Sequence, residues 1–368
     1  MNNQHNNRNG YYPPNQGYYP PNQYYQPPQY GQPMYQPPYF DQQQYMMQQD
    51  IVRRRNQQKS ELRKIGVGIG VALMLYLVIQ TVSGSVLGAL GLSELYSTSP
   101  VFQSCFSVFA EVLGVAAPFG IMALIFKKKY EYPVVPTAKL GKADAAAWIG
   151  VGMAVCIGAN YIAGIVEMMF KSIGKSASGP KGLDPDSLLA CIIEWVAIAI
   201  IPPICEEFAM RCCTMSLLRK YGKGFAVLAV SLIFGIMHGN ILQFVFAFIV
   251  GLILAYVTIR TDSVLPAMFI HGFNNGRSTL NNTVQYLTNE KTAEAVTLVI
   301  TVLWIVAGVA GIVYLAAKKK LAPPKTAPDT DPAQLTMGAK LSCLIPGMAV
   351  PTIILILLAI YTLATSQA

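Results

Sequence analysis

The chain alternates long apolar segments with short polar ones from residue 65 almost to its end. Nine apolar segments can be distinguished, at 65–91, 101–126, 144–170, 186–204, 224–240, 241–259, 264–282, 293–317 and 341–364. An α-helix needs about 20 apolar residues to cross a hydrocarbon core of about 30 Å, and these segments are close to that length. The pattern therefore predicts an all-α polytopic bundle of about eight or nine transmembrane helices.

The composition agrees with a membrane protein and excludes other classes. Of the 368 residues, 53% are hydrophobic and only 12% are charged, whereas soluble domains carry about 25% charged residues. An ordinary soluble enzyme and a secreted disulfide scaffold are therefore excluded. The seven cysteines lie mostly in apolar segments without metal-type spacing, and we predict that they fill small apolar spaces.

The net charge of +9 is explained by membrane topology, so we expect the lipid bilayer and no nucleic acid as a partner. Lysines and arginines gather between apolar segments, mainly at 53–64, 127–142, 211–223 and 318–320. Such clusters favour the cytoplasmic side of a membrane. With helices that alternate in direction, these clusters all fall on one side, which predicts a multi-pass protein of the cell membrane with a cytoplasmic N-terminus. The loop with Lys171, Lys175 and Lys181 is the exception.

The N-terminal residues 1–52 differ from the rest of the chain. They are rich in Tyr, Pro, Gln and Asn, and the unit GYYPPNQ occurs twice in succession at 10–23. A segment with so few aliphatic residues cannot offset its ordering entropy. We predict a disordered cytoplasmic tail, which either makes weak protein contacts or only solubilises the chain.

Three further parts complete the predicted organisation. Residues 53–320 form the transmembrane bundle, with its motifs at 185–285. A proline-rich linker at 321–340 precedes a C-terminal transmembrane helix at 341–368. Because the linker separates this helix from the bundle, we expect the helix to be peripheral.

Ionisable side chains within apolar segments are candidate functional groups, because they are costly in lipid. Two histidines lie there, His238 and His271. Each has a partner four residues away, Phe234 and Asn275 respectively, and residues at this spacing share a helix face. One such histidine could simply pack, but two with partners indicate a site.

The sequence PPICEEFAMR, at 202–211, supplies a third element at the predicted cytoplasmic end of the fourth segment. Glu207 lies four residues before Arg211, the favourable order for an ion pair on a helix. Glu206 lacks this spacing and points about 100° away from Glu207. We therefore assign Glu207 and Arg211 to a structural pair and expect Glu206 to face a cavity. Taken alone, both glutamates could belong to a solvated helix end.

One carboxylate, two imidazoles and one carboxamide at membrane depth suit the hydrolysis of an amide or ester. A carboxylate helped by an imidazole can deprotonate water, while the carboxamide and the second imidazole donate hydrogen bonds to the oxyanion. Glu206, His238 and His271 also form a reasonable set of Zn²⁺ ligands. A zinc-assisted mechanism and a metal-free one both stay open, and no organic cofactor is expected.

Three other residues keep alternatives open. Cys205 adjoins Glu206, so a cysteine nucleophile is not excluded. Glu111 and Glu194 lie within apolar segments, and each either lines the cavity or is a buried, hydrogen-bonded group.

Three motifs in order, EExxxR at 206–211, FxxxH at 234–238 and HxxxN at 271–275, resemble those of a known family. This is the CPBP group of CAAX-protease and bacteriocin-processing intramembrane endopeptidases, which includes the type II CAAX prenyl endopeptidases. The resemblance covers 185–285, and by architecture 65–317.

This resemblance implies an intramembrane protease that cleaves a peptide bond at the cytoplasmic side of the membrane. It implies that Glu206 and His238 activate water and that His271 and Asn275 stabilise the oxyanion. The substrate would be a peptide or protein, which is prenylated for some family members, and the family leaves metal dependence open. The alternative is a non-catalytic membrane scaffold or bacteriocin-immunity-type protein with an interaction-prone tail. A transporter is disfavoured, because no internal repeat is evident.

Overall fold

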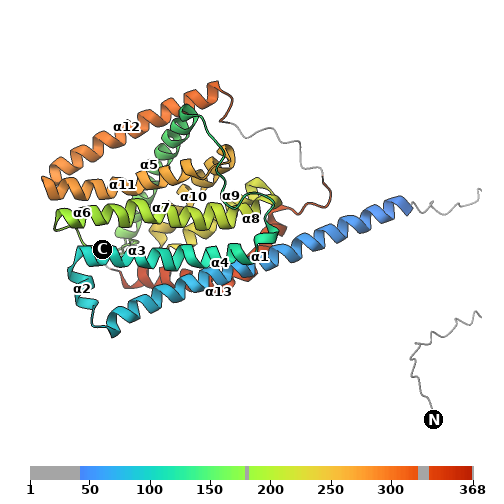
Figure 1. Cartoon of the computed structure of the whole chain (residues 1–368), viewed down its shortest axis with the longest axis horizontal. Helices are drawn as coiled ribbons and strands as arrows, with labels where there is room; N and C mark the ends of the chain where they lie inside the picture. The colour runs from blue at the N-terminus through green and yellow to red at the C-terminus, as the bar shows by residue number, and fades with distance from the viewer. Residues whose placement is uncertain (1–41, 179–181, 322–330, 367–368) are drawn as a thin grey trace, which may run out of the picture. The chain divides into compact units, whose positions relative to one another are not determined.

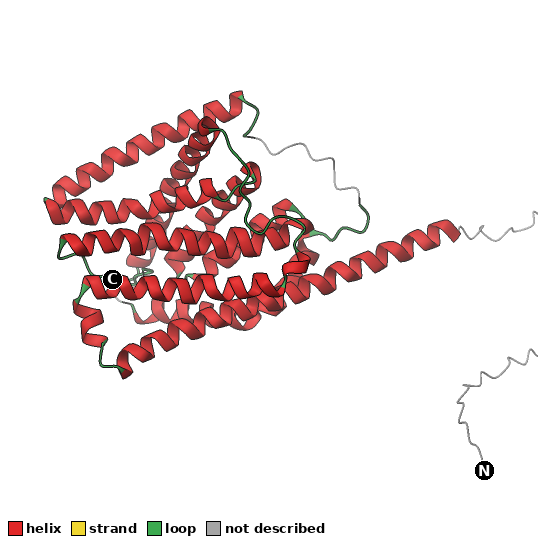
Figure 2. Cartoon of the chain, in the orientation of Figure 1, coloured by secondary structure: helices red, strands yellow, loops and turns green. Residues whose placement is uncertain are grey.

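The computed structural model describes residues 42–178, 182–321 and 331–366. The arrangement below is that of the unit from Gln48 to Ala368. In these ranges the regular structure is helical and no strand is formed, apart from one isolated bridge between Thr137 and Ser263 (Figure 2). The all-α fold expected from the sequence is confirmed. Most of the predicted tail, residues 1–41, and residues 322–330 of the predicted linker lie outside the described ranges.

The helices follow the order of the predicted apolar segments. Their bounds are α1 Gln42–Ala89, α2 Ser93–Thr98, α3 Pro100–Glu111, α4 Ala117–Ile125, α5 Lys142–Lys171, α6 Leu188–Glu194, α7 Ile201–Glu207, α8 Ser216–Leu218, α9 Lys223–Met237, α10 Ile241–Thr261, α11 Leu265–Leu287, α12 Glu290–Ala317 and α13 Met337–Thr365. Three π-helical segments, η1 Val112–Ala116, η3 Trp195–Ile200 and η4 Phe208–Met215, join α3 to α4 and α6 through α7 to α8. Such widened turns often mark functional sites.

Seven helices in the described ranges are long and apolar enough to cross a membrane, with 100–125 and 188–221 each counted as one helix. This confirms a multi-pass membrane protein. The two other predicted segments differ from the expectation. Helix α9 is apolar but has only 15 residues, and α11 has 23 residues but does not reach the apolarity of the seven. Polar residues on α11 line a cavity, which explains the difference.

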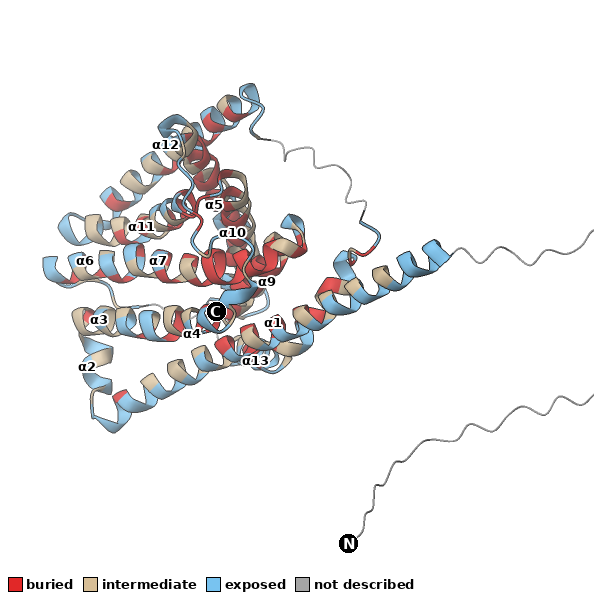
Figure 3. Ribbon diagram, turned by 45° about the vertical axis from the view of Figure 1, so that its right-hand side comes forward, coloured by how far each residue is buried: buried red, intermediate tan, exposed pale blue. Residues whose placement is uncertain are grey.

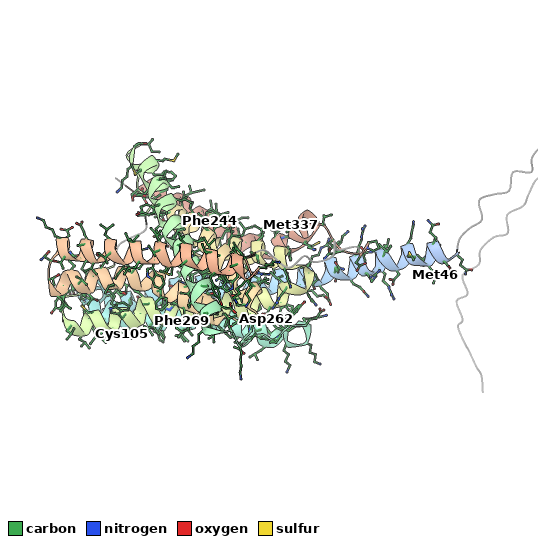
Figure 4. The ribbon with its side chains drawn as sticks, turned by 90° about the horizontal axis from the view of Figure 1, so that it is seen from above. Met46, Cys105, Phe244, Asp262, Phe269 and Met337 are labelled. Atoms are coloured by element: carbon green, nitrogen blue, oxygen red, sulfur yellow. The ribbon has the colours of Figure 1, made fainter. Side chains whose placement is uncertain are left out.

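The connections between helices gather at two ends of the bundle, as Figure 1 shows. One end holds the basic clusters: Glu61 on α1 accepts hydrogen bonds from Lys129 at 2.7 Å and from Lys220 at 3.2 Å. Asp262, which ends α10 and is labelled in Figure 4, lies at this end and pairs with Arg219 at 2.6 Å. The helix directions therefore follow the alternation that the sequence predicts. We call this the basic end.

Two apolar cores hold the helices together, and Figure 3 shows their buried positions. The first contains residues of α1, α4, η4, α9 and α13, and the second contains residues of α5, α10, α11 and α12. Helix α10 contributes to both cores. The EExxxR and FxxxH motifs come from the first group of helices and HxxxN from the second, so the motifs meet where the cores adjoin.

The C-terminal helix α13 is part of the bundle, which corrects the expected peripheral position. A Cβ atom on Gly66 or Gly70 of α1 would collide with the backbone of α13, and one on Gly347 would collide with α1. Small residues let helix backbones approach closely in a membrane. Leu344 of α13 is accordingly buried in the first core.

Helix α1 also begins earlier than the sequence suggested. It starts at Gln42, so residues 42–52 are helical although we assigned them to the tail; Met46, labelled in Figure 4, lies on this part. The hydrophobic pattern does not reveal this extension because its residues are mostly polar.

Candidate active site

The helix that carries the EExxxR motif is longer than predicted. The sequence pattern ended it at 204, but the helical run continues through the π-helix η4 to Tyr221. Glu206 lies 18 residues after Leu188 and 15 before Tyr221, or about 27 and 22 Å along the axis at 1.5 Å per residue. The glutamate pair is therefore near the middle of the bundle and not at a helix end.

The two prolines before the glutamates leave a backbone carbonyl without its usual partner. The carbonyl of Ile198 would accept from residue 202 in an α-helix or from residue 203 in a π-helix, but both are prolines and have no N–H. The side-chain amide of Asn275 donates to this carbonyl at 3.0 Å. The proline pair thus leaves the Ile198 carbonyl free, and the asparagine of the HxxxN motif satisfies it.

Two glycines of α11 allow this contact to form. A Cβ atom on Gly272 would lie 3.1 Å from the carbonyl oxygen of Ala199, and one on Gly276 would lie 3.0 Å from the ring of Trp195. Both glycines face η3, three residues before and one residue after Asn275. Because neither has a side chain, α11 lies against η3 closely enough for Asn275 to reach the carbonyl.

The predicted ion pair between Glu207 and Arg211 is formed. Arg211 Nη1 lies 3.0 Å from Glu207 Oε1, and both side chains are fully buried. Arg211 Nη2 also donates to the carbonyl of Gly251 at 3.2 Å. Its guanidinium carbon lies 4.8 Å from the centre of the Phe234 ring, a cation–π contact. These three contacts, with Glu207, Gly251 and the Phe234 ring, hold the guanidinium of Arg211 in place.

Glu207 has a second partner that the sequence did not reveal. Its Oε1 atom also lies 3.0 Å from Nδ1 of His271. Nε2 of the same ring lies 3.7 Å from Oε2 of Glu206. A carboxylate can only accept, so Nδ1 of His271 carries the donated proton. Glu207 therefore sets the orientation of His271 in addition to pairing with Arg211.

His238 is oriented by the backbone of its own helix. Its Nδ1 atom lies 2.7 Å from the carbonyl oxygen of Phe234. A carbonyl only accepts, so Nδ1 is the donor, and in the neutral ring Nε2 is an acceptor. The Phe234 ring lies edge-on to both histidines, with centroids 5.0 Å from His238 and 6.0 Å from His271. Phe234 of the FxxxH motif thus packs against both imidazoles.

A cavity of about 820 Å³ brings the four predicted catalytic side chains together. Glu206, His238, His271 and Asn275 all line it, and so does Phe234. The side chain of Glu206 is 13% exposed. Its Oε2 atom has no hydrogen-bond partner among the described residues. A carboxylate oxygen without a partner, on a residue that lines the cavity together with both histidines, is suited to accept a hydrogen bond from water.

The predicted zinc ligands do not form a metal group. No set of three or more His, Cys, Asp or Glu side chains in the described ranges is arranged to hold a metal ion. The metalloprotease hypothesis, with Glu206 among its ligands, is therefore not supported by the donor geometry.

None of the remaining sequence candidates is among the residues that line the described cavity. Glu194 is buried and accepts a hydrogen bond from Asn282 at 2.7 Å. Of its two expected roles, it therefore has that of a buried, hydrogen-bonded group. Glu111 and Cys205 are not among the residues that line the described cavity. Oε1 of Glu111 is buried without a hydrogen-bond partner in the described ranges.

Sequence reasoning missed a polar row that continues the cavity beyond the motifs. Asn160 of α5 donates to Asn274 at 3.4 Å, and Arg277 donates to Thr301 of α12 at 3.0 Å. Ser278 lines the cavity further along α11. The signal was present in the sequence, because these residues of α11 follow His271 at intervals of three or four.

Comparison with known proteins identifies one family. Residues 188–277 match the family model of type II CAAX prenyl endopeptidase, Rce1-like. No curated protein and no solved structure matches the chain. The matched segment contains all three motifs and begins at the first residue of α6. Residues 188–277 are therefore similar to the Rce1-like family, and this match supports the resemblance to the CPBP family.

Proposed function

We propose that this protein is an intramembrane endopeptidase that hydrolyses a peptide bond with a water molecule activated by Glu206 and His238. The Rce1-like match indicates a protease. The observation that carries the proposal is the convergence of Glu206, His238, His271 and Asn275 on one cavity at the middle of the bundle.

Water activation is assigned to Glu206 and His238. A water molecule between them would donate one hydrogen bond to the unpartnered carboxylate oxygen of Glu206 and another to Nε2 of His238. Positioned general bases contribute about 10²- to 10⁴-fold to rate. As the water oxygen attacks the carbonyl carbon, Glu206 takes the proton. It then returns that proton to the leaving amine when the C–N bond breaks.

Oxyanion stabilisation is assigned to His271 and Asn275. Asn275 has two amide protons, one of which is used on the Ile198 carbonyl, so the other is available. His271 can donate from Nε2 when its ring is an imidazolium. The Glu207 carboxylate at Nδ1 stabilises that charge. Removing one oxyanion donor typically costs about 10²- to 10³-fold in kcat.

The substrate is proposed to be a peptide or protein with an apolar segment near the cleaved bond. One part of the cavity is lined by Ile157, Ile198, Phe246 and Val250. Such a lining suits apolar side chains or a prenyl group, as the family name suggests for its members. On the basis of the sequence alone, we also propose that the N-terminal tail makes weak contacts with other proteins.

The orientation in the cell membrane is also a proposal. The basic end would face the cytoplasm together with the N-terminus, and the family resemblance of the motifs supports cleavage at that side. Glu206, however, lies at mid-depth, and the cavity lining extends to Glu294 and Leu298 in the first turns of α12, which begins at the opposite end. Maleimide labelling of a cysteine placed in the cavity lining therefore determines from which side of the membrane the peptide reaches Glu206.

The proposal is tested with the full-length protein in lipid vesicles and a library of membrane-inserting peptides. We expect Glu206→Gln, His238→Ala and His271→Ala each to abolish cleavage without affecting vesicle insertion. Glu290→Gln, at the exposed start of α12, is the matched control and should cleave normally. Normal cleavage by all three variants would rule out the proposed chemistry. A phenotype lost on deletion of residues 1–41, but kept in Glu206→Gln, would favour the scaffold alternative.

A further inference from the structure

His238 stands in a turn that interrupts the bundle at membrane depth. Helix α9 has only 15 residues, or about 22 Å of axis, so it ends before it has crossed a hydrocarbon core of about 30 Å. His238 ends α9, Gly239 has a left-handed φ of 66°, and Asn240 precedes the first turn of α10. Irregular backbone at this depth must be buried in protein or face a water-filled cavity. The turn at 238–240 therefore needs a cover where the cavity does not reach it.

The bonds within the turn are local to the two helix ends. Nδ1 of His238 lies 2.7 Å from the carbonyl oxygen of Phe234 on α9. The Asn240 side chain accepts a hydrogen bond from the N–H of Gln243 on α10 at 2.8 Å. Gly239 joins the two ends, and glycine is the residue with the greatest backbone freedom. The position of the His238 ring therefore also depends on what packs against Gly239.

Two leucines of α13 pack on this turn. A Cβ atom on Gly239 would lie 3.4 Å from Cδ2 of Leu358 and 3.6 Å from Cδ2 of Leu355, so both methyl groups are in contact distance. Leu355 is buried, whereas Leu358 is 47% exposed. Helix α13 lies outside residues 188–277, which match the Rce1-like family. The apolar cover of the histidine turn therefore comes from a helix beyond the matched segment.

Helix α13 is held on both sides of these leucines. Before them, Gly347 packs on the backbone of α1. After them, Nζ of Lys175 donates to the carbonyls of Ala364 at 2.6 Å and Ser366 at 3.2 Å. A lysine at the last carbonyls of a helix also interacts favourably with the helix dipole. Because the leucines lie between two anchors, α13 keeps a defined position against the turn.

We propose that α13 completes the active site by holding the turn at 238–240, with Leu355 and Leu358 as positioning residues for His238. This inference rests on the proposed endopeptidase function. Removal of the two side chains would leave space beside Gly239, into which the turn would shift. His238 would then lose its alignment with Glu206, and a misplacement of about 1 Å can lower a rate about 10²-fold. Substrate binding would change little, because neither leucine lines the described cavity.

The first test is the cleavage of a membrane-inserting peptide by the full-length protein in vesicles. We expect Leu355→Ala with Leu358→Ala to lower kcat at least about tenfold and to leave KM within about twofold of normal. Leu355→Met with Leu358→Met, which keeps a similar volume, should restore most of kcat. The matched control is Ile353→Ala with Leu357→Ala, because these side chains of α13 are 54% and 58% exposed. It should cleave normally.

A second measurement separates positioning from a general loss of stability. Diethyl pyrocarbonate acylates an unprotonated imidazole nitrogen, and mass spectrometry of the digested protein locates the modified histidine. In the double alanine variant His238 should react faster than normal, whereas His271, which is held by Glu207, should react at its normal rate. Faster reaction of both histidines or of neither, or a normal kcat, would overturn the proposal.

Two further outcomes are also decided by these measurements. If the double alanine variant does not fold, Leu358→Ala alone, at the partly exposed position, replaces it and is judged by the same kcat and the same histidine reactivities. If the unmodified protein cleaves no peptide, the proposed function is contradicted. The reactivity of His238 in the variant then still decides whether α13 holds the turn.

Discussion

Glu207 accepts hydrogen bonds from side chains of two different helices, and this double contact makes a sharp prediction. Its Oε1 atom lies 3.0 Å from both Arg211 Nη1 and His271 Nδ1. In Glu207→Gln the Arg211 charge would remain buried without a carboxylate. Breaking one side of a buried ion pair costs about 3–5 kcal/mol of stability. We therefore expect the single variant to be strongly destabilised and inactive.

A double variant separates the two roles of Glu207. Replacing a buried ion pair by apolar side chains of similar volume is often neutral or stabilising, so Glu207→Gln with Arg211→Met should regain most of the stability. Cleavage should stay at least about 100-fold below normal, because His271 still lacks the carboxylate that stabilises its imidazolium.

The two quantities can be measured on the same preparations. Thermal unfolding in detergent reports stability, and peptide cleavage in vesicles reports activity. Arg53→Met provides a matched control, because Arg53 pairs with Asp50 on the exposed start of α1. It should change stability by about 0–1 kcal/mol and leave cleavage intact. A double variant as unstable as the single one, or one with normal activity, would refute this account of Glu207.

Three further predictions follow from other contacts. Gly70→Leu should disrupt the packing of α1 against α13 and lower the unfolding temperature, whereas Gly84→Leu, where a Cβ meets nothing within 4 Å, should not; equal unfolding temperatures would contradict the close approach. Asn275→Ala should lower kcat by about 10²- to 10³-fold and also destabilise the fold by about 1–3 kcal/mol, because the Ile198 carbonyl loses its donor; unchanged stability would argue against that bond. Leu298→Cys, in a Cys105→Ser background, should react with a membrane-impermeant maleimide from the side opposite the basic end, and labelling from the basic side alone would contradict the direction of the cavity.

Much of the fold was predictable because membrane helices carry a strong hydrophobic signal. The predicted helix bounds and packing were wrong where interactions other than hydrophobicity determine where a helix ends or what it packs against. The Pro202–Pro203 pair suggested a helix terminus, but a π-helix and the Asn275 amide accommodate it. The polar start of α1 has no apolar face to reveal it. The proline-rich linker suggested a detached last helix, whereas Gly347 shows that α13 packs closely on α1.

The candidate site was predictable where its contacts are local. The pairing of Glu207 with Arg211 and the alignment of Phe234 with His238 both follow from four-residue spacing. The bond between Glu207 and His271 joins helices 64 residues apart in sequence, so no local spacing could reveal it. The bond between Arg277 and Thr301 likewise joins α11 to α12, and no local spacing predicts it.

Mass spectrometry of peptide cleavage by purified protein in vesicles, compared with Glu206→Gln, tests whether Glu206 activates the attacking water. Glu206→Gln keeps the size and polarity of the side chain but removes the carboxylate that would take the proton from water. If Glu206 is the base, the unmodified protein yields two product masses that sum to the peptide plus one water, and the variant leaves the peptide intact. The same products at the same rate from Glu206→Gln would contradict it.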